Sequence, residues 1–114
     1  MRYWTFAIIS LSACGPAPTN EEMWSAHWSE PTADVVRVLA KNRIRGCGEF
    51  YQKANSGSNG DYAVACSRMP DGSGRPAWVG YEVFVHSGEV LGPDLTAVYM
   101  QFGGPPRELT KDDL

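Results

Sequence analysis

Two short stretches of turn-forming residues constrain the fold of this chain more than any other feature of its sequence. They separate three apolar runs typical of β-strands, at residues 47–53, 61–67 and 77–86. The separating residues 55–60 and 70–76 are dense in Gly, Asn, Ser, Asp and Pro. A parallel crossover needs about a dozen or more residues, so strands joined this closely must pair antiparallel. The sequence therefore predicts a β-meander.

A fourth strand and one helix complete the predicted domain. A tight turn at Ser87 leads into a short strand over residues 89–91. Residues 33–45 contain no helix breaker before Gly46, and their apolar side chains gather on one half of a helical wheel. We expect an α+β domain over residues 31–103, with one N-terminal amphipathic helix packed on a three- to four-stranded antiparallel meander. The helix residues expected to face the sheet are Ala33, Val35, Val36, Leu39, Ala40 and Ile44.

Aromatic side chains are concentrated in the predicted strands, and one helix can cover only one face of the sheet. Residues 95–102 could form a short helix that begins after Asp94, or a last strand, and could cover the other face. If that face stays open, its aromatic side chains form a patch suited to partner recognition. Trp78 and Tyr81 are the candidate binding residues in this interpretation.

Cys47 and Cys66 lie on either side of the first predicted hairpin loop. If residues 55–60 form that loop, Cys47 lies opposite Cys66 and Tyr51 lies opposite Tyr62. Both sulfur atoms then point to the same face of neighbouring strands. In an oxidising compartment such a pair forms a disulfide, which would stabilise the fold by roughly 3 kcal/mol. A reactive thiol or a metal-binding pair would need further groups that the sequence does not provide.

The first 13 residues are predicted to be a targeting segment rather than part of the fold. Arg2 is the only charged residue there, and it precedes a short apolar stretch. As a helix, residues 3–14 would rise about 18 Å, well short of a hydrocarbon core of about 30 Å. Cleavage by an ordinary secretory signal peptidase is poorly supported, because Leu11 would occupy a position that favours small residues.

Leu11-Ser12-Ala13-Cys14 resembles the lipobox of bacterial lipoproteins at every position. The resemblance implies cleavage before Cys14 and acylation of that cysteine, which would anchor the chain in a lipid bilayer. Gly15 resembles a residue that sorts lipoproteins to the outer membrane. The expected location is therefore the cell envelope, at the periplasmic face of the outer membrane. A soluble secreted protein is the alternative.

The predicted mature chain begins at Cys14 and carries 9 basic and 13 acidic residues, a net charge of −4. Residues 14–30 are expected to form a Pro-rich polar tether, and residues 104–114 a flexible tail. Trp24 and Trp28 lie four residues apart within the tether, where they could contact a membrane or a glycan. We favour packing against the domain for this pair. The acidic balance argues against a nucleic-acid partner.

Arg37, Lys41 and Arg45 form a basic stripe on the polar half of the predicted helix. One interpretation is a binding surface for anionic headgroups, peptidoglycan carboxylates or an acidic envelope protein. The other is an ordinary solvated helix face.

No motif in the sequence predicts catalysis, a cofactor or a metal site. There is no Cys-x-x-Cys, His-Glu-x-x-His, Gly-x-Ser-x-Gly or phosphate-binding glycine loop. His86 with Glu82 and Glu89 could supply at most a weak metal site, and a solvated His86 is the simpler interpretation. Glu49, Asp61 and Glu82 have no sequence context that identifies an acid–base pair.

The sequence thus predicts a small lipid-anchored binding or structural module of the envelope, without catalysis. An inhibitor or accessory module for an envelope hydrolase is the first alternative, and residues 71–75 would be its binding loop. A small envelope enzyme is the second. The order of one helix followed by three strands is similar to the PepSY half-repeat of periplasmic inhibitor-like modules, a likeness of element order alone.

Overall fold

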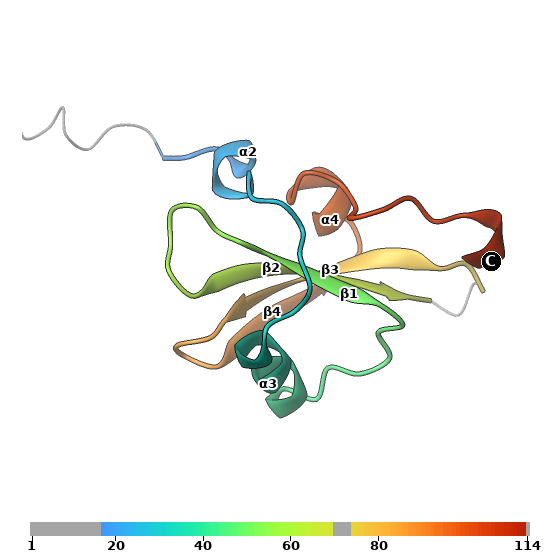
Figure 1. Ribbon diagram of the computed structural model, residues 1–114, viewed down its shortest axis with the longest axis horizontal. Helices are drawn as coiled ribbons and strands as arrows, with labels where there is room; N and C mark the ends of the chain where they lie inside the picture. Colours follow the sequence, from blue (N-terminus) through green and yellow to red (C-terminus); the bar gives the residue numbers. More distant parts are fainter. Residues whose placement is uncertain (1–16, 70–73, 114) are drawn as a thin grey trace, which may run out of the picture.

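The fold is a four-stranded antiparallel sheet with short helices on both faces (Figure 1). The computed structural model describes residues 17–69 and 74–113. The strands follow the order of the chain across the sheet, so the α+β class and the antiparallel pairing predicted from the short loops are confirmed. They are β1 (Phe50–Ala54), β2 (Asp61–Arg68), β3 (Ala77–Phe84) and β4 (Glu89–Asp94).

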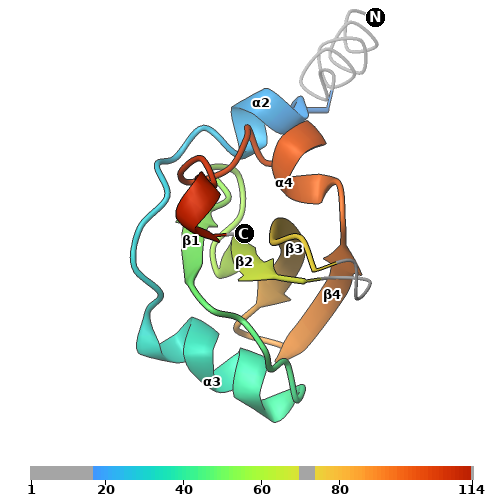
Figure 2. The same ribbon diagram turned by 90° about the vertical axis from the view of Figure 1, so that its right-hand side faces the viewer.

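The helices are short, and none within the described part of the chain is long and apolar enough to cross a membrane. They are α2 (Asn20–Met23), α3 (Ala33–Lys41) and α4 (Ala97–Met100), followed by a 3₁₀ turn at Lys111–Asp113. Helix α3 lies at one end of the molecule, and α2 and α4 lie together at the opposite end (Figures 1 and 2).

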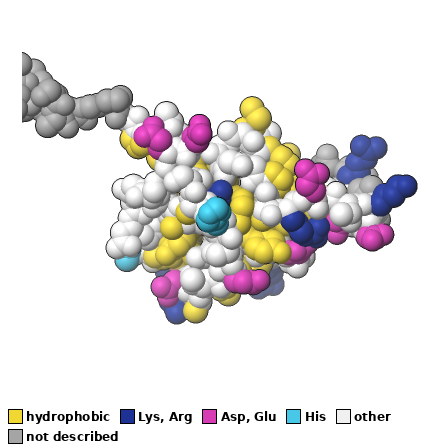
Figure 3. Space-filling model, turned by 45° about the horizontal axis from the view of Figure 1, so that its top comes forward, with side chains coloured by type: hydrophobic (Ala, Val, Ile, Leu, Met, Phe, Trp, Pro, Cys, Tyr) yellow, Lys and Arg dark blue, Asp and Glu magenta, His cyan; other side chains and the backbone are white. Residues whose placement is uncertain are grey.

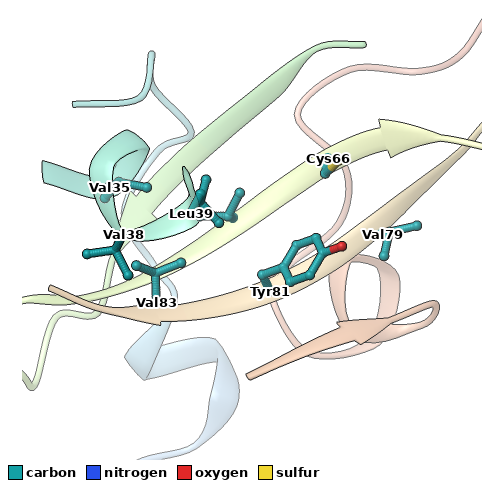
Figure 4. Packing of buried hydrophobic residues seen from close by; sticks show 8 residues of the cluster. Val35, Val38, Leu39, Cys66, Val79, Tyr81 and Val83 are labelled. Carbon is teal, nitrogen blue, oxygen red and sulfur yellow. The ribbon is translucent and has the colours of Figure 1, made fainter. Parts of the chain in front are cut away.

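The α3 face of the sheet carries the larger aliphatic core (Figure 4). Val35, Val38 and Leu39 of α3 point at the strands and are buried there. Successive strand residues point to opposite faces, so every second residue of β2 and β3 contributes to this cluster. The strand residues that pack with α3 are Val64, Cys66, Val79, Tyr81 and Val83.

Helix α3 differs from its prediction in length and in its buried side. It ends at Lys41 rather than Arg45, because the Asn42 side chain donates to the carbonyls of Val38 and Gly88, and Arg43 adopts a left-handed φ of 61°. Only positions 35, 38 and 39 are buried, which is the spacing of one narrow helical face. Three of the residues expected to face the sheet are instead exposed: Ala33, Val36 and Ala40.

Helix α4 covers the opposite face, which we call the α4 face. Of the two predictions for residues 95–102, the structure has the helix, and the Asp94 carboxylate accepts hydrogen bonds from the backbone N–H groups of Thr96 and Ala97 at 2.8 and 3.1 Å. Gly80 allows the close approach, because a Cβ there would lie 2.8 Å from the Ala97 Cβ. The buried residues on this face are Trp24, Ala63, Ala65, Trp78, Ala97, Val98 and Phe102.

Residues 20–30, which we expected in the tether, pack on the domain. Helix α2 begins with a capping box between Thr19 and Glu22, and Trp24 directly after it is buried against Phe102 with ring centroids 5.0 Å apart. Trp28 donates from Nε1 to the Gly104 carbonyl at 2.9 Å. The packing favoured for the two tryptophans is therefore the observed one, and only residues 17–19 of the described tether precede α2.

A buried lysine joins the N-terminal segment to the end of α4. Lys53 on β1 donates from Nζ to the carbonyl of Phe102 at 2.8 Å and to that of Trp24 at 3.4 Å. The Nζ atom also lies 4.4 Å from the centre of the Trp28 ring. Burial lowers the pKa of Lys53, while the two carbonyls compensate part of its lost hydration.

Residues 105–113, expected to belong to a flexible tail, return to the α4 face. The Arg107 carbonyl accepts a hydrogen bond from Trp78 Nε1 at 3.0 Å. Its guanidinium forms ion pairs with Glu49 and with Asp113. These contacts lower the pKa of Glu49, and that of Asp113 to about 2, through hydrogen bonds from Arg107.

The Cys47–Cys66 disulfide is present, with the two Cα atoms 5.2 Å apart. The predicted register is nevertheless wrong by three positions, because Phe50 rather than Cys47 pairs with Cys66. The loop itself lies at residues 55–60 as predicted, and within it the Asn55 N–H donates to the Asp61 carbonyl at 2.9 Å. A shift by an odd number moves side chains to the other face, so strict alternation would separate the two cysteines.

A bulge at the start of β1 restores the contact between the cysteines. The Gly48 N–H donates to the Ser67 carbonyl, and the Ser67 N–H donates to the Glu49 carbonyl, each at 2.9 Å. Two residues of one segment thus oppose one residue of β2, which is the arrangement of a β-bulge. The additional residue reverses which face of the sheet the preceding side chains point to, so Cys47 packs against the α3 face beside Cys66.

We expect the disulfide to carry a large part of the stability of the domain. The bond joins residues 19 positions apart, so reduction should cost roughly 3 kcal/mol and lower Tm by about 10 °C or more. Thermal unfolding with and without reductant measures this, with the Cys47→Ala/Cys66→Ala double variant as the control that should no longer respond to reductant. Alkylation of both thiols in the untreated native protein would contradict the pairing.

Candidate functional site

The basic residues predicted as a binding surface are all exposed at the α3 end of the domain. Arg37 and Lys41 lie on α3, whereas Arg45 lies beyond its end and does not continue a helical stripe. Arg43, which the sequence reasoning omitted, is exposed in the same turn. We call these four residues the α3 basic surface. Asp34, the only acidic residue between positions 33 and 45, forms an exposed ion pair with Arg37 at 3.2 Å.

The α3 basic surface carries a net positive charge on a domain whose overall charge is negative. Exposed ion pairs such as Asp34–Arg37 contribute little energy and open readily, so they leave the arginine free to bind another anion. The backbone of this turn is held in place, because the Arg68 guanidinium donates to the Arg45 carbonyl and to the Tyr81 hydroxyl, the latter at 2.5 Å. The geometry is that of a helix and a fixed turn that carry exposed cationic side chains.

Trp78 and Tyr81 do not form the exposed aromatic patch that was considered for them. Their exposed fractions are 1% and 2%. Trp78 lies on the α4 face under the C-terminal segment and Tyr51, while Tyr81 lies on the α3 face under Arg68. Both faces of the sheet are covered, so these residues belong to the core and are excluded as binding residues.

A hollow of about 400 Å³ lies between α3 and β1, beside the basic surface. Its apolar wall includes the exposed Val36 and Phe50, and its acidic lining residues are Glu30 and Glu49. Glu49 is held by Arg107 and accepts a hydrogen bond from the Tyr51 hydroxyl at 2.9 Å, so its carboxylate fixes the C-terminal segment. The two carboxylates therefore do not form an acid–base pair.

The structure does single out one carboxyl pair, Asp61 and Glu82. Asp61 lies diagonally across from Glu82 on the α4 face, because Glu82 pairs with Ala63. Asp61 has an exposed fraction of 6%, and its Oδ2 accepts a hydrogen bond from Asn55 Nδ2 at 2.9 Å. Among the described groups, Oδ1 has no N–H or hydroxyl donor. A protonated Glu82 can donate a hydrogen bond to this carboxylate.

Burial, the hydrogen bond with Asp61 and the charge of Asp61 together raise the pKa of Glu82 to about 7. Glu82 also lines a hollow of about 260 Å³ together with Asp94. Asp94 is ionised for a structural reason, since hydrogen bonds from Thr96 lower its pKa at the start of α4. We therefore assign Asp61 and Glu82 a role in pH-dependent stability.

The other residues considered for chemistry are not brought together. No group of three His, Cys, Asp or Glu residues in the part of the chain that the structure describes could hold a metal ion. Cys14 with the lipobox, and residues 71–73 of the loop considered for an inhibitor, lie outside the described residues. A β2–β3 turn centred on residues 70–76 would not have located the Asp61–Glu82 pair, because it places the two side chains on opposite faces, whereas the observed register places both on one face.

No family model matches this chain, and no curated protein or solved structure matches it.

We expect the stability of the domain to fall as the pH rises from about 4.5 to about 7. The folded-state pKa of Glu82 lies above its ordinary value of 4.5, so the stabilising proton is bound at low pH and lost through about pH 7. Glu82→Gln should remove this dependence, since an amide can donate to Asp61 at any pH. Chemical denaturation at several pH values measures it, and Glu89→Gln on β4 is the control. Equal slopes for the wild type and Glu82→Gln would contradict the assignment.

The α3 basic surface makes a second prediction. If it binds an anionic component of the envelope, replacing Arg37, Lys41 and Arg45 by Gln should weaken binding to isolated envelope fractions, and added salt should weaken the wild type in the same way. Sedimentation with the envelope fraction at two ionic strengths measures both effects. Lys111→Gln, which removes a positive charge from the C-terminal turn, is the control. If neither the substitutions nor added salt changes the binding, the α3 basic surface is an ordinary solvated helix end.

Proposed function

We propose that this chain is an exported binding domain of the bacterial cell envelope, anchored by lipid on Cys14 and without catalytic activity. The observation that carries the proposal is the combination of a lipobox at residues 11–14 with a disulfide-bonded domain that begins directly after it. Structural disulfides form in oxidising compartments such as the periplasm, which is where a lipobox directs a chain. The two features are independent and support the same compartment.

The short link between Cys14 and α2 supports a domain that works close to a membrane. Only five residues separate Cys14 from Asn20, a reach of about 20 Å even when fully extended. Helix α2, which follows this link, is held by two hydrogen bonds from Ser56. The Ser56 N–H donates to the Met23 carbonyl at 2.9 Å, and the Ser56 hydroxyl donates to the Glu22 carbonyl at 2.6 Å. The sheet is thus tied to the start of the described chain.

The partner in this proposal is an anionic component of the envelope that binds the α3 basic surface. Four exposed cationic side chains on α3 and the turn that follows it suit a multivalent anion, such as the carboxylates of peptidoglycan or an acidic envelope protein. The net negative charge of the chain makes a nucleic-acid partner a poor fit. Gly15 after the lipobox cysteine favours the periplasmic face of the outer membrane.

Replacing Cys14 by Ser tests the anchor. The variant should lose incorporation of labelled fatty acid and leave the membrane fraction, because no other part of the mature chain supplies acyl chains. Metabolic labelling and fractionation in the native host measure both effects. The Cys47→Ala/Cys66→Ala variant is the matched control, since it also loses cysteines but should keep its label. Equal membrane retention and unchanged processing of Cys14→Ser would overturn the proposal.

A further inference from the structure

Helices α2 and α4 lie side by side at the end of the domain where the described chain begins (Figures 1 and 2). A hollow of about 500 Å³ lies between them. Acidic side chains and protruding hydrophobic side chains are visible near this end of the surface (Figure 3). The residues that line the hollow are Asn20, Glu21, Trp24, Ser25, Met100, Gln101 and Gly103.

Met100 is the most exposed large apolar side chain in the described residues, with an exposed fraction of 80%. Ala97 and Val98 anchor α4 to the sheet, so its last turn directs Met100 away from the core. Trp24 lies deeper in the same hollow, and its Nε1 has no acceptor among the described residues. Trp24 itself stays in the core with an exposed fraction of 3%, so Met100 is the apolar side chain that can reach the boundary between lipid headgroups and acyl chains.

The charges around the hollow indicate which lipids fit. Glu21 and Glu22 are the charged residues of α2, and α4 has none. Helix α3, which carries Arg37 and Lys41, lies at the opposite end of the domain (Figure 2). Contact at the α2–α4 end is therefore apolar rather than electrostatic, and it favours zwitterionic over anionic lipids.

We propose that the α2–α4 end of the domain rests on the bilayer that holds the acyl chains of Cys14, with Met100 inserted at the boundary between headgroups and acyl chains. The inference depends on the lipid anchor proposed above. Two residues separate Cys14 from Ala17, a reach of about 10 Å, so the anchor delivers this end of the domain to the membrane first. The α3 basic surface then faces away from that membrane.

Oxidation of the exposed methionines tests the orientation within one molecule. The acylated protein, purified from membranes, is reconstituted into phosphatidylcholine vesicles and treated with hydrogen peroxide, and peptide mass spectrometry follows each methionine. Burial of a Met side chain in the bilayer favours its inserted state over its exposed state by about tenfold or more. Because peroxide reacts with the exposed state, Met100 should oxidise about tenfold more slowly than in the soluble Cys14→Ser chain. Met69, exposed fraction 57%, directly follows β2 away from this end and should oxidise at the same rate in both samples.

The possible outcomes separate this inference from the anchor. Protein that carries no acyl chain and does not float with the vesicles would overturn the proposed function, and the inference with it. Protein that floats with vesicles while Met100 oxidises at the soluble rate would overturn the inference alone. Protection of Met69 as well as Met100, or protection that appears only with phosphatidylglycerol and disappears with salt, would also overturn it, because another surface would then face the membrane.

Discussion

The structure depends on the pairing of β2 with β3, whose side chains must be covered on both faces of the sheet. These two strands are central and eight residues long, and their alternating side chains are buried on each side. A nine-residue helix covers the α3 face, while α4, Trp24 and the C-terminal segment together cover the other. These peripheral segments pack on the sheet because their burial removes the apolar side chains of β2 and β3 from water. Lys53 joins two of the segments by donating to the carbonyls of Trp24 and Phe102.

The sequence was sufficient for the strand order, because short loops leave antiparallel neighbours as the only option. It was insufficient for deciding which faces are covered. Trp78 and Tyr81 were candidates for a binding surface because their local sequence does not show what covers them. In the structure, Arg107 covers Trp78 and Arg68 covers Tyr81. The cover of a sheet face depends on long-range contacts, and local periodicity does not encode those.

The disulfide shows how a correct pairing can follow from an incorrect register. Cys47 and Cys66 were predicted to lie opposite one another, yet the strands are shifted by three positions and the bulge at Gly48 brings the sulfur atoms together. The loop lies at residues 55–60 as predicted, with the Asn55 side chain accepting from the Gly57 N–H, so the place of the loop alone did not determine the strand register. The Asp61–Glu82 pair was missed for a similar reason, because only the actual β2–β3 register identifies the two carboxyls as neighbours.

The two ends of the domain differ in chemistry, and this difference gives the molecule a direction. The chain enters at α2, beside acidic residues and the exposed Met100, while α3, which carries Arg37 and Lys41, lies on the far side of the sheet. A membrane that held the anchor would approach the first end, and its headgroups would be separated from α3 by the thickness of the domain. Cationic side chains interact over about one Debye length, roughly 8 Å at physiological salt, so they could not reach those headgroups across the sheet. In the proposed orientation, a partner of the α3 basic surface comes from the side of the envelope that faces away from the anchor.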